Sequence, residues 1–357
     1  MNKIINHALD IKSMNLEELK EYFTCMGEKA FRAKQVYQWL HQKLITNTDQ
    51  MTNLPKDLRE WMKGQCELNV LKQAECQISK QDGTRKYLFA LSDGPLIESV
   101  LMKYKFGNSV CISSQAGCRM GCTFCASAIG GLVRNLHASE MLEQIYRIST
   151  DIGERISHVV VMGTGEPLDN YDNLIKFIEI LSDEKGLNIS QRNITVSTSG
   201  IVPRILDLAE KKLQITLALS LHAASQETRR KLMPIANKYE LSSVIAACDE
   251  YFAQTGRRIT YEYSLIHGFN DSKDDAAQLL ALLKGKNCHL NLIPVNPVQE
   301  SSYMQPTADD ILAFKNKLEK NGINVTIRRE LGRDIDGACG QLRKRYLLRE
   351  SLMASER

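Results

Sequence analysis

The sequence predicts an α/β fold, an incomplete βα barrel of parallel strands with a small helical domain at its N-terminus. Two observations predict the barrel. From residue 110 onward, short β-rich runs alternate with helical stretches, and repeated βα units imply a parallel sheet with helices outside. About six such units follow one another, fewer than the eight of a closed barrel. In folds of this kind the functional groups gather at the carboxyl ends of the strands.

The N-terminal region, residues 1–75, is expected to be the helical accessory domain. Its apolar side chains recur at helical spacing, as in Leu16, Leu19 and Phe23. Residues 76–105 are expected to form a β linker segment, because polar and apolar residues alternate around an Asp82-Gly83 turn. The barrel is assigned to residues 106–345, and residues 346–357 are expected to be a C-terminal tail.

The barrel strands are predicted from short apolar, β-branched runs, and its helices from a 3.6-residue apolar period. The strands are expected at residues 110–114, 158–162, 193–198, 215–221, 259–265, 289–293 and 323–328. The helices are expected at residues 140–149, 173–181, 241–252, 275–283 and 309–320.

Composition restricts the compartment and the chemistry of the cysteines. No stretch approaches the ~20 apolar residues that span a bilayer, and the N-terminus has no apolar signal core, so the protein is expected in the cytoplasm. Ten cysteines in a reducing compartment favour metal-binding or catalytic thiols over a disulfide scaffold. The net charge of +4 decides nothing about nucleic acid, although arginines crowd the C-terminal end.

Three cysteines in one short loop form the strongest motif of the chain. Cys118, Cys122 and Cys125 have the spacing C-x3-C-x2-C and follow a predicted strand. Three thiolates can hold three irons of a [4Fe–4S] cluster and leave the fourth iron open to S-adenosyl-L-methionine (SAM), as in radical SAM enzymes. The alternatives are a structural zinc site with Cys111 as fourth ligand, or buried free thiols. The compact spacing at the start of a βα domain favours the cluster.

Small and polar residues follow several predicted strands, where a barrel would bind its cofactor. The glycine-rich turn at residues 163–167 offers backbone groups and Glu166 for the methionyl ammonium of SAM. Polar groups on the later strand ends are candidates for contacts with ribose or adenine. Each residue alone is more often a strand-end cap, and only their recurrence favours a pocket. The candidates are Gly165, Glu166, Ser197, Ser220, Leu221, His222 and Asn296.

Two further thiols are candidates for chemistry. Cys339 lies between Gly337 and Gly340, in an open turn that suits a mobile nucleophile and equally suits a small residue in a tight turn. Cys111 lies on the first barrel strand, close to the cluster loop, where core packing is the simpler interpretation.

Beyond these single motifs, the chain resembles the RlmN family of radical SAM methyltransferases, which modify adenine C2 in 23S ribosomal RNA and in tRNA. The resemblance covers nearly the whole chain. The matching segments are residues 31–41, Met51-Thr-Asn-Leu-Pro55, Cys111-Ile-Ser-Ser-Gln-Ala-Gly-Cys118, Gly163-Thr-Gly-Glu-Pro167, residues 196–203, Leu219-Ser-Leu-His222, Lys231-Leu-Met-Pro-Ile235 and residues 334–342.

The resemblance implies a role for each matching residue. The three loop cysteines match the cluster ligands, and the strand-end candidates match positions that contact SAM. Cys339 matches the cysteine that becomes S-methylated, and Cys111 matches the resolving cysteine. Glu98 matches the family's proton acceptor, an assignment that rests on the resemblance alone because the residue otherwise reads as a surface acid.

The implied reaction is indirect, because the electron-poor C2 carbon cannot attack the methyl group of SAM. Two SAM molecules are used in each turnover: one methylates Cys339, and the other yields the radical that activates this methyl group. The resulting methylene joins C2, Glu98 takes the C2 proton, and Cys111 releases the product by forming a disulfide with Cys339.

The resemblance further implies partners: 23S rRNA at the peptidyl transferase centre, tRNA at the adenosine 3′ of the anticodon, and an electron donor such as flavodoxin or ferredoxin. A monomer without membrane contact is expected. The target adenine must leave its stack to enter a barrel.

Three alternatives remain at this stage. A Cfr-type methyltransferase of adenine C8 would share the cluster and both thiols, but Pro167 after Glu166 favours C2, because the C8 enzymes tend to have Ala there. A zinc- or cluster-bearing RNA-binding protein without catalysis is a different class. A radical SAM enzyme acting on a small metabolite is the third, and the basic C-terminal end and the accessory domain weigh against it.

Overall fold

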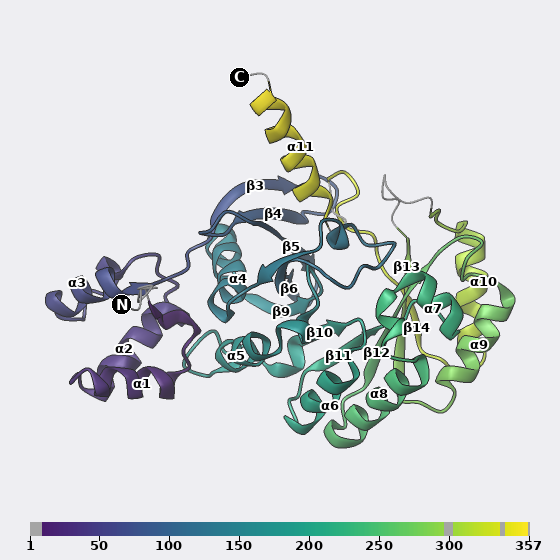
Figure 1. Ribbon diagram of the computed structural model, residues 1–357, viewed down its shortest axis with the longest axis horizontal. Coiled ribbons are helices and arrows are strands. Elements are labelled where there is room, and N and C mark those ends of the chain that lie inside the picture. The colour runs from purple at the N-terminus through teal and green to yellow at the C-terminus, as the bar shows by residue number, and fades with distance from the viewer. Residues whose placement is uncertain (1–8, 296–302, 336–339, 356–357) are drawn as a thin grey trace, which may run out of the picture.

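The structure, a computed structural model, describes residues 9–295, 303–335 and 340–355 (Figure 1). Its centre is one ten-stranded sheet in the order β14-β13-β12-β11-β10-β9-β6-β5-β4-β3. From β6 to β14 every neighbouring pair of strands is parallel. These strands are β6 Gly107–Cys111, β9 Ile156–Val161, β10 Ile194–Thr198, β11 Thr216–Ser220, β12 Ile259–Leu265, β13 Cys288–Pro294 and β14 Val325–Ile327.

Helices follow the parallel strands and lie outside the sheet (Figure 1). The predicted α/β fold with a parallel sheet is therefore confirmed. None of the helices in the described ranges is long and apolar enough to cross a membrane. The outer helices are α4 Ala138–Ile152, α5 Tyr171–Ser182, α6 Val202–Glu210, α8 Leu241–Thr255, α9 Lys273–Leu283 and α10 Ala308–Glu319.

Three antiparallel strands extend the sheet beyond β6: β3 Lys72–Ile78, β4 Arg85–Ala90 and β5 Leu96–Tyr104. The hairpin between β3 and β4 turns at Asp82-Gly83, as the sequence predicts. The segment expected as a linker is thus continuous with the barrel sheet. The sequence predicts β structure over residues 76–105 without resolving β5 as a separate strand. Most of its residues are buried on both faces, so no polar and apolar alternation marks it.

Three helices were not predicted. In α6, Pro203 reads as a helix breaker, but proline is tolerated in the first turn, where it lies here. The short helix α7 Gln226–Leu232 is dominated by polar residues, which hide its one buried side. Helix α11 Gln341–Ser355 occupies most of the segment expected as a tail at residues 346–357, and its basic residues gave no apolar stripe to read.

The N-terminal region contains α1 Leu16–Cys25, α2 Ala30–His41 and α3 Lys56–Gln65, and the short strands β1 Leu9–Asp10 and β2 Cys66–Glu67 pair in parallel at its base. Helix α1 begins with a capping box between Asn15 and Glu18, which satisfies backbone donors at its first turn. The helical character of this region agrees with its apolar spacing. Figure 1 shows these helices at one side of the sheet.

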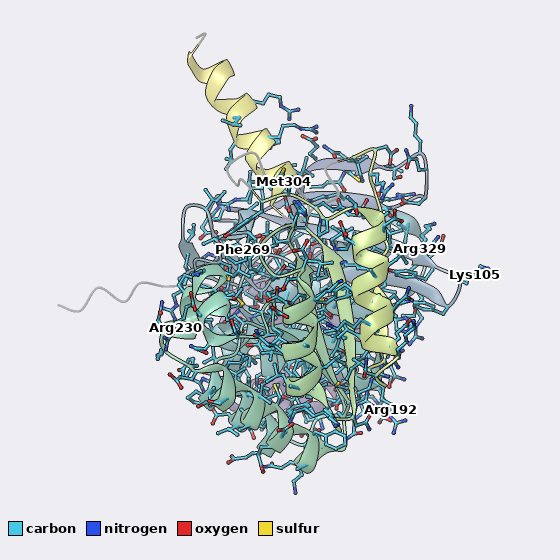
Figure 2. All side chains as sticks on the ribbon, turned by 90° about the vertical axis from the view of Figure 1, so that its right-hand side faces the viewer. Lys105, Arg192, Arg230, Phe269, Met304 and Arg329 are labelled. Carbon is cyan, nitrogen blue, oxygen red and sulfur yellow. The ribbon has the colours of Figure 1, made fainter. Side chains whose placement is uncertain are left out.

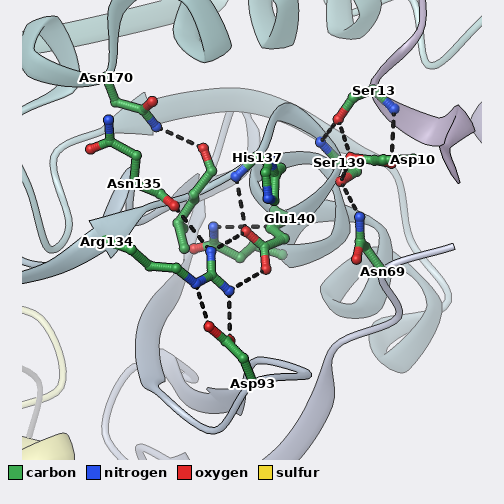
Figure 3. Close-up of polar contacts among 12 residues, drawn as sticks. Asp10, Ser13, Asn69, Asp93, Arg134, Asn135, His137, Ser139, Glu140 and Asn170 are labelled. Atoms are coloured by element: carbon green, nitrogen blue, oxygen red, sulfur yellow. Dashed lines mark hydrogen bonds and ion pairs between the residues drawn. The ribbon is translucent and has the colours of Figure 1, made fainter. Parts of the chain in front are cut away.

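The N-terminal region is fastened to the start of α4 (Figure 3). The backbone N–H of Ser139 donates to Ser13 Oγ over 2.9 Å, and Ser139 Oγ donates to Asp10 over 2.7 Å. One turn along α4, Glu143 forms an ion pair with Lys12 at 2.6 Å, and both side chains are fully buried. A buried ion pair of this kind fixes how two elements meet, because neither charge can be left alone.

We expect Lys12→Met to weaken this junction without altering the chemistry of the barrel. Removing one partner of a buried pair costs roughly 3–5 kcal/mol, and the loss should fall at or below the lower end, because Arg147 remains 3.1 Å from Glu143. Thermal unfolding followed by circular dichroism measures this. A melting temperature equal to or above that of the wild type would contradict it.

Candidate active site

The loop of three cysteines is closed at its base by a two-stranded ribbon, β7 Gln115–Gly117 and β8 Leu132–Asn135. Gly117 has φ +78°, and a Cβ there would collide with the carbonyl oxygen of Gly131, so only glycine fits. The Cys118 N–H donates to the same carbonyl over 3.0 Å. The ribbon therefore sets where the loop leaves the barrel.

The far side of this loop rests on α7 and the residues after it. The Thr123 N–H donates to the Leu232 carbonyl over 3.0 Å. Leu232 and Met233 are buried, and Cys122 and Phe124 pack against them. The Leu-Met-Pro-Ile segment thus supports the loop that carries the cysteines, a role its sequence did not reveal.

The three loop thiols fit an iron–sulfur cluster by their chemistry. All three are free, and Cys118 and Cys122 each lie within electrostatic reach of Cys125. Burial raises the pKa of the Cys118 thiol to about 11, a cost that metal binding removes because a coordinating thiol loses its proton. Within the described ranges no three such side chains converge on a single-ion site. A cluster does not need that, because each thiolate binds a different iron.

The turn after β9 holds Gly165 and Glu166 against the base of the cysteine loop. Gly165 has φ +112°, and a Cβ would lie 2.6 Å from Gln115 Cβ. The Glu166 carboxylate accepts from the N–H groups of Ser199, at 2.6 Å, and Leu168, at 3.0 Å. Burial raises the pKa of Glu166 against these hydrogen bonds. The side chain therefore joins the segments that follow β9 and β10, and its predicted contact with the ammonium group of SAM stays a prediction.

The ends of β10 and β11 bring the next candidates together. Ser197 and Ser220 face each other with their hydroxyl oxygens 3.5 Å apart. Leu221 is fully buried. His222 accepts from the Ser264 N–H over 2.9 Å, and its ring meets Phe124 of the cysteine loop at 4.7 Å between centroids. Burial lowers the pKa of His222 to about 3, so the ring is neutral.

A buried arginine that the sequence interpretation missed lies behind these strand ends. Arg229 is fully buried and donates to the carbonyls of Ser199, at 2.6 Å, and of Ser220 and Leu221, each at 3.3 Å. Burial lowers its pKa to about 10, opposed by the thiol of Cys122. In sequence it belongs to a run of three basic residues, which reads as a solvated face. In the structure, the guanidinium group of Arg229 instead binds the ends of β10 and β11 and lies within electrostatic reach of Cys122 in the cysteine loop.

A cavity of about 750 Å³ lies within the curve of the sheet and is lined by strands from β5 to β14. Cys111 and Glu98 are on one wall, and Glu262, Asn291 and Arg328 are on the other. Burial raises the pKa of the Cys111 thiol, while the nearby cations Arg328 and Lys86 oppose the rise. The structure thus brings the predicted resolving thiol and the predicted proton acceptor to one cavity. Asn296 and Cys339 lie outside the described residues.

Glu98 receives three donors. Its Oε2 pairs with Lys86 Nζ at 3.0 Å and accepts from the Gly340 N–H at 2.6 Å. Its Oε1 accepts from the Arg343 N–H at 2.7 Å. Gly340 and Arg343 flank the first turn of α11, so a residue on β5 caps this helix from a distance.

Gly340 also contacts the cysteine loop. It has φ +80°, and a Cβ would lie 2.8 Å from Ala126 Cβ and 3.1 Å from the Ser127 nitrogen. Ala126 directly follows Cys125, and Gly340 directly follows Cys339. The chain next to Cys339 is therefore held between Glu98 and the end of the cysteine loop.

A parallel sheet with a C-x3-C-x2-C loop at its first strand end and a polar pocket beside it defines a radical SAM enzyme. Residues 112–280 match the radical SAM superfamily, and residues 9–68 match the ribosomal RNA large subunit methyltransferase N-terminal domain. Radical SAM enzymes use a [4Fe–4S] cluster and SAM.

Relatives over nearly the full length name the family. The chain is 63% identical to a probable dual-specificity RNA methyltransferase RlmN of Lachnospira eligens, covering 95% of this chain and 97% of that protein. It is 51% identical to one from Clostridium novyi, over 95% and 98%. A radical SAM methyltransferase of Sphaerobacter thermophilus has a similar crystal structure, with a TM-score of 0.89 at 41% identity over 93% and 98% of the two chains. The chain belongs to the RlmN family of radical SAM RNA methyltransferases.

We expect Gly340→Ala to lower RNA methylation by about 100-fold, because a methyl group at Gly340 must push the chain away from Ala126, and small misplacements near reacting atoms are costly. Iron content and methyl transfer to RNA, measured on the same preparation, test this. Gly153→Ala is the matched control, since Gly153 also has positive φ, +65°, but nothing lies near its Cβ position. Equal losses in both variants would show that backbone strain alone is responsible.

Proposed function

We propose that the protein methylates C2 of an adenosine in 23S rRNA, at the peptidyl transferase centre, and in tRNA, 3′ of the anticodon, through an S-methylated Cys339. The observation that supports this most is the position of Gly340, between Glu98 and the residue after Cys125. Cys111 lines the same cavity as Glu98. Glu98 and the end of the cysteine loop therefore contact Gly340, the residue after Cys339, and Cys111 lines the cavity that Glu98 also lines.

Each of these residues has a defined task. Cys339, as a thiolate, accepts the methyl group of one SAM, and S-adenosylhomocysteine leaves. Cys118, Cys122 and Cys125 would hold the [4Fe–4S] cluster, which would supply the electron for reductive cleavage of a second SAM. The methyl group on Cys339 loses one hydrogen atom to the 5′-deoxyadenosyl radical and its carbon then bonds to adenine C2, from which Glu98 takes the proton. The Cys111 thiolate attacks the Cys339 sulfur, so that a disulfide forms and the methylated adenine is released.

Glu98 has room for the C2 proton despite its other contacts. An ionised carboxylate offers about four acceptor positions. Three donors reach Glu98 among the described residues, two on Oε2 and one on Oε1. The carboxylate can therefore hold the turn after Cys339 and still accept a proton at Oε1.

The RNA side of the proposal is supported by basic residues at the mouth of the cavity. Arg328, Arg329 and Arg333 all line it. Arg333 is paired with Glu330, whereas no hydrogen bond or ion pair within the described ranges engages the guanidinium groups of Arg328 and Arg329. Arg328 lies within electrostatic reach of Glu262 and Cys111. Figure 2 shows Arg329 at the surface. Such groups suit the phosphates beside an unstacked nucleotide. A monomer in the cytoplasm, reduced by a flavodoxin or ferredoxin, completes the proposal.

The position of methylation is tested by isotopes. With deuterium placed at C2 of the substrate adenine, we expect loss of the label on turnover, because Glu98 takes that proton. Deuterium at C8 should be retained. Mass spectrometry of the product nucleoside reads both results. The reverse pattern would identify a Cfr-type enzyme that methylates C8.

We expect Cys111→Ala to trap the protein covalently on its RNA, because addition to C2 still occurs but no thiol then attacks the Cys339 sulfur. The species should survive denaturing electrophoresis and should require Cys339. Cys76→Ala is the matched control, a half-buried strand thiol on β3. Normal turnover by Cys111→Ala, or an adduct in a Cys339→Ala background, would refute the assignment of the two thiols.

A further inference from the structure

We propose that Lys86 is a positioning residue for this reaction. Its ammonium group holds the Glu98 carboxylate in place and, through it, the turn that begins directly after Cys339. This role deepens the proposed function and rests on it. Neither the resemblance to the RlmN family nor any motif in the sequence draws attention to Lys86.

The pair is built into the sheet. Lys86 lies on β4 and Glu98 on the neighbouring antiparallel strand β5, where Lys86 is opposite Val100 and Glu98 is opposite Leu88. The two side chains are therefore diagonal neighbours on one face of the sheet. Their charged atoms are 3.0 Å apart, and their side chains are 0% and 3% exposed.

Such a pair is expensive to bury, and an apolar pair of similar volume is often at least as stable. What the charged pair provides is an acceptor that apolar side chains lack. The Glu98 carboxylate binds the N–H groups of Gly340 and Arg343 at the buried start of α11. The helix terminus offers only a partial positive charge, and Lys86 supplies the full charge that a buried carboxylate requires.

The contacts converge on one oxygen. Glu98 Oε2 carries both the Lys86 ammonium, at 3.0 Å, and the Gly340 N–H, at 2.6 Å. On its other side Gly340 fits tightly against Ala126 and Ser127. Because Gly340 follows Cys339 directly in the chain, we expect a shift of the carboxylate to displace the residue that is proposed to carry the methyl group. The ammonium also lies within electrostatic reach of Cys111, the second thiol of the reaction.

The test compares two lysines of equal burial. Lys86→Met removes the ammonium beside Glu98, and Lys12→Met removes the ammonium beside Glu143, at the junction with α4. Each holoprotein is reconstituted anaerobically and given SAM, reductant and RNA. Three quantities are measured: iron content, the methylated fraction of Cys339 by intact-protein mass spectrometry, and the ratio of 5′-deoxyadenosine to methyladenosine.

For Lys86→Met we expect a normal iron content and continued SAM cleavage, with methyladenosine formed about 10–100-fold more slowly because the sulfur is misplaced. The ratio of 5′-deoxyadenosine to methyladenosine should rise, since SAM cleavage no longer leads to product. Lys12→Met should keep the wild-type ratio despite its lower melting temperature. Lys86→Arg, which keeps the charge, should bring the ratio of 5′-deoxyadenosine to methyladenosine part of the way back to the wild-type value. If Lys86→Met does not fold, Lys86→Gln, which can still donate to Glu98, takes its place with a smaller expected effect.

Two results would overturn the role of Lys86. One is a wild-type ratio and rate in folded Lys86→Met. The other is an equal change in Lys12→Met and Lys86→Met, which would mean that any lost buried ion pair has this effect. If the wild-type protein itself never carries a methyl group on Cys339, the proposed function fails, and the role of Lys86 fails with it. The methylation of Cys339 in the wild-type protein thus distinguishes a failure of the proposed function from a failure of the role of Lys86 alone.

Discussion

The Glu98 carboxylate joins three parts of the chain that are far apart in sequence. It lies on β5, pairs with Lys86 on β4, and binds the first turn of α11, 242 residues beyond Glu98. A charged group can occupy a buried position only if its hydrogen bonds and its charge are both matched. The end of the chain has to return to the start of the sheet to meet that condition. The close fit of Gly340 against the cysteine loop, and the part of the cavity lined by Gln341, depend on this closure.

The local patterns of the sequence were sufficient for the parallel half of the molecule. Short apolar or β-branched runs predicted β9 to β14, and five of the outer helices show a clear apolar period. The strand β6 begins at Gly107, three residues before the strand predicted at residues 110–114, because its residues Asn108 and Ser109 are polar. The cysteine loop could be singled out because its C-x3-C-x2-C spacing at the start of a βα domain favours a cluster over zinc or free thiols. Cys111 and Cys339 could be singled out from the residues, but their division of labour came only from the family resemblance.

What remained hidden depends on contacts between distant residues. Lys86 and Glu98 look like two more charged positions, and only the register of β4 against β5 makes them neighbours. Arg229 looks like part of a solvated basic run, yet three backbone carbonyls enclose it. The strand β5 and the helix α11 lack the alternation or the apolar stripe on which prediction relies, since β5 is buried on both faces and α11 is largely basic. Sequence periodicity reports burial on one side of an element and is silent about the identity of the partner.

The distance in sequence between Glu98 and the start of α11 also determines the order in which parts of the site can form during synthesis. The cysteine loop needs its ribbon strands and Leu232, which leave the ribosome more than a hundred residues before Gly340 does. Gly340 can donate its hydrogen bond to Glu98 only when nearly the whole chain has been synthesised. In an unfinished chain the cysteine loop can therefore adopt its structure before Gly340 binds Glu98. Under the proposed function, the cysteines that would hold the cluster are thus in place before Cys339, the residue proposed to carry the methyl group, has been synthesised.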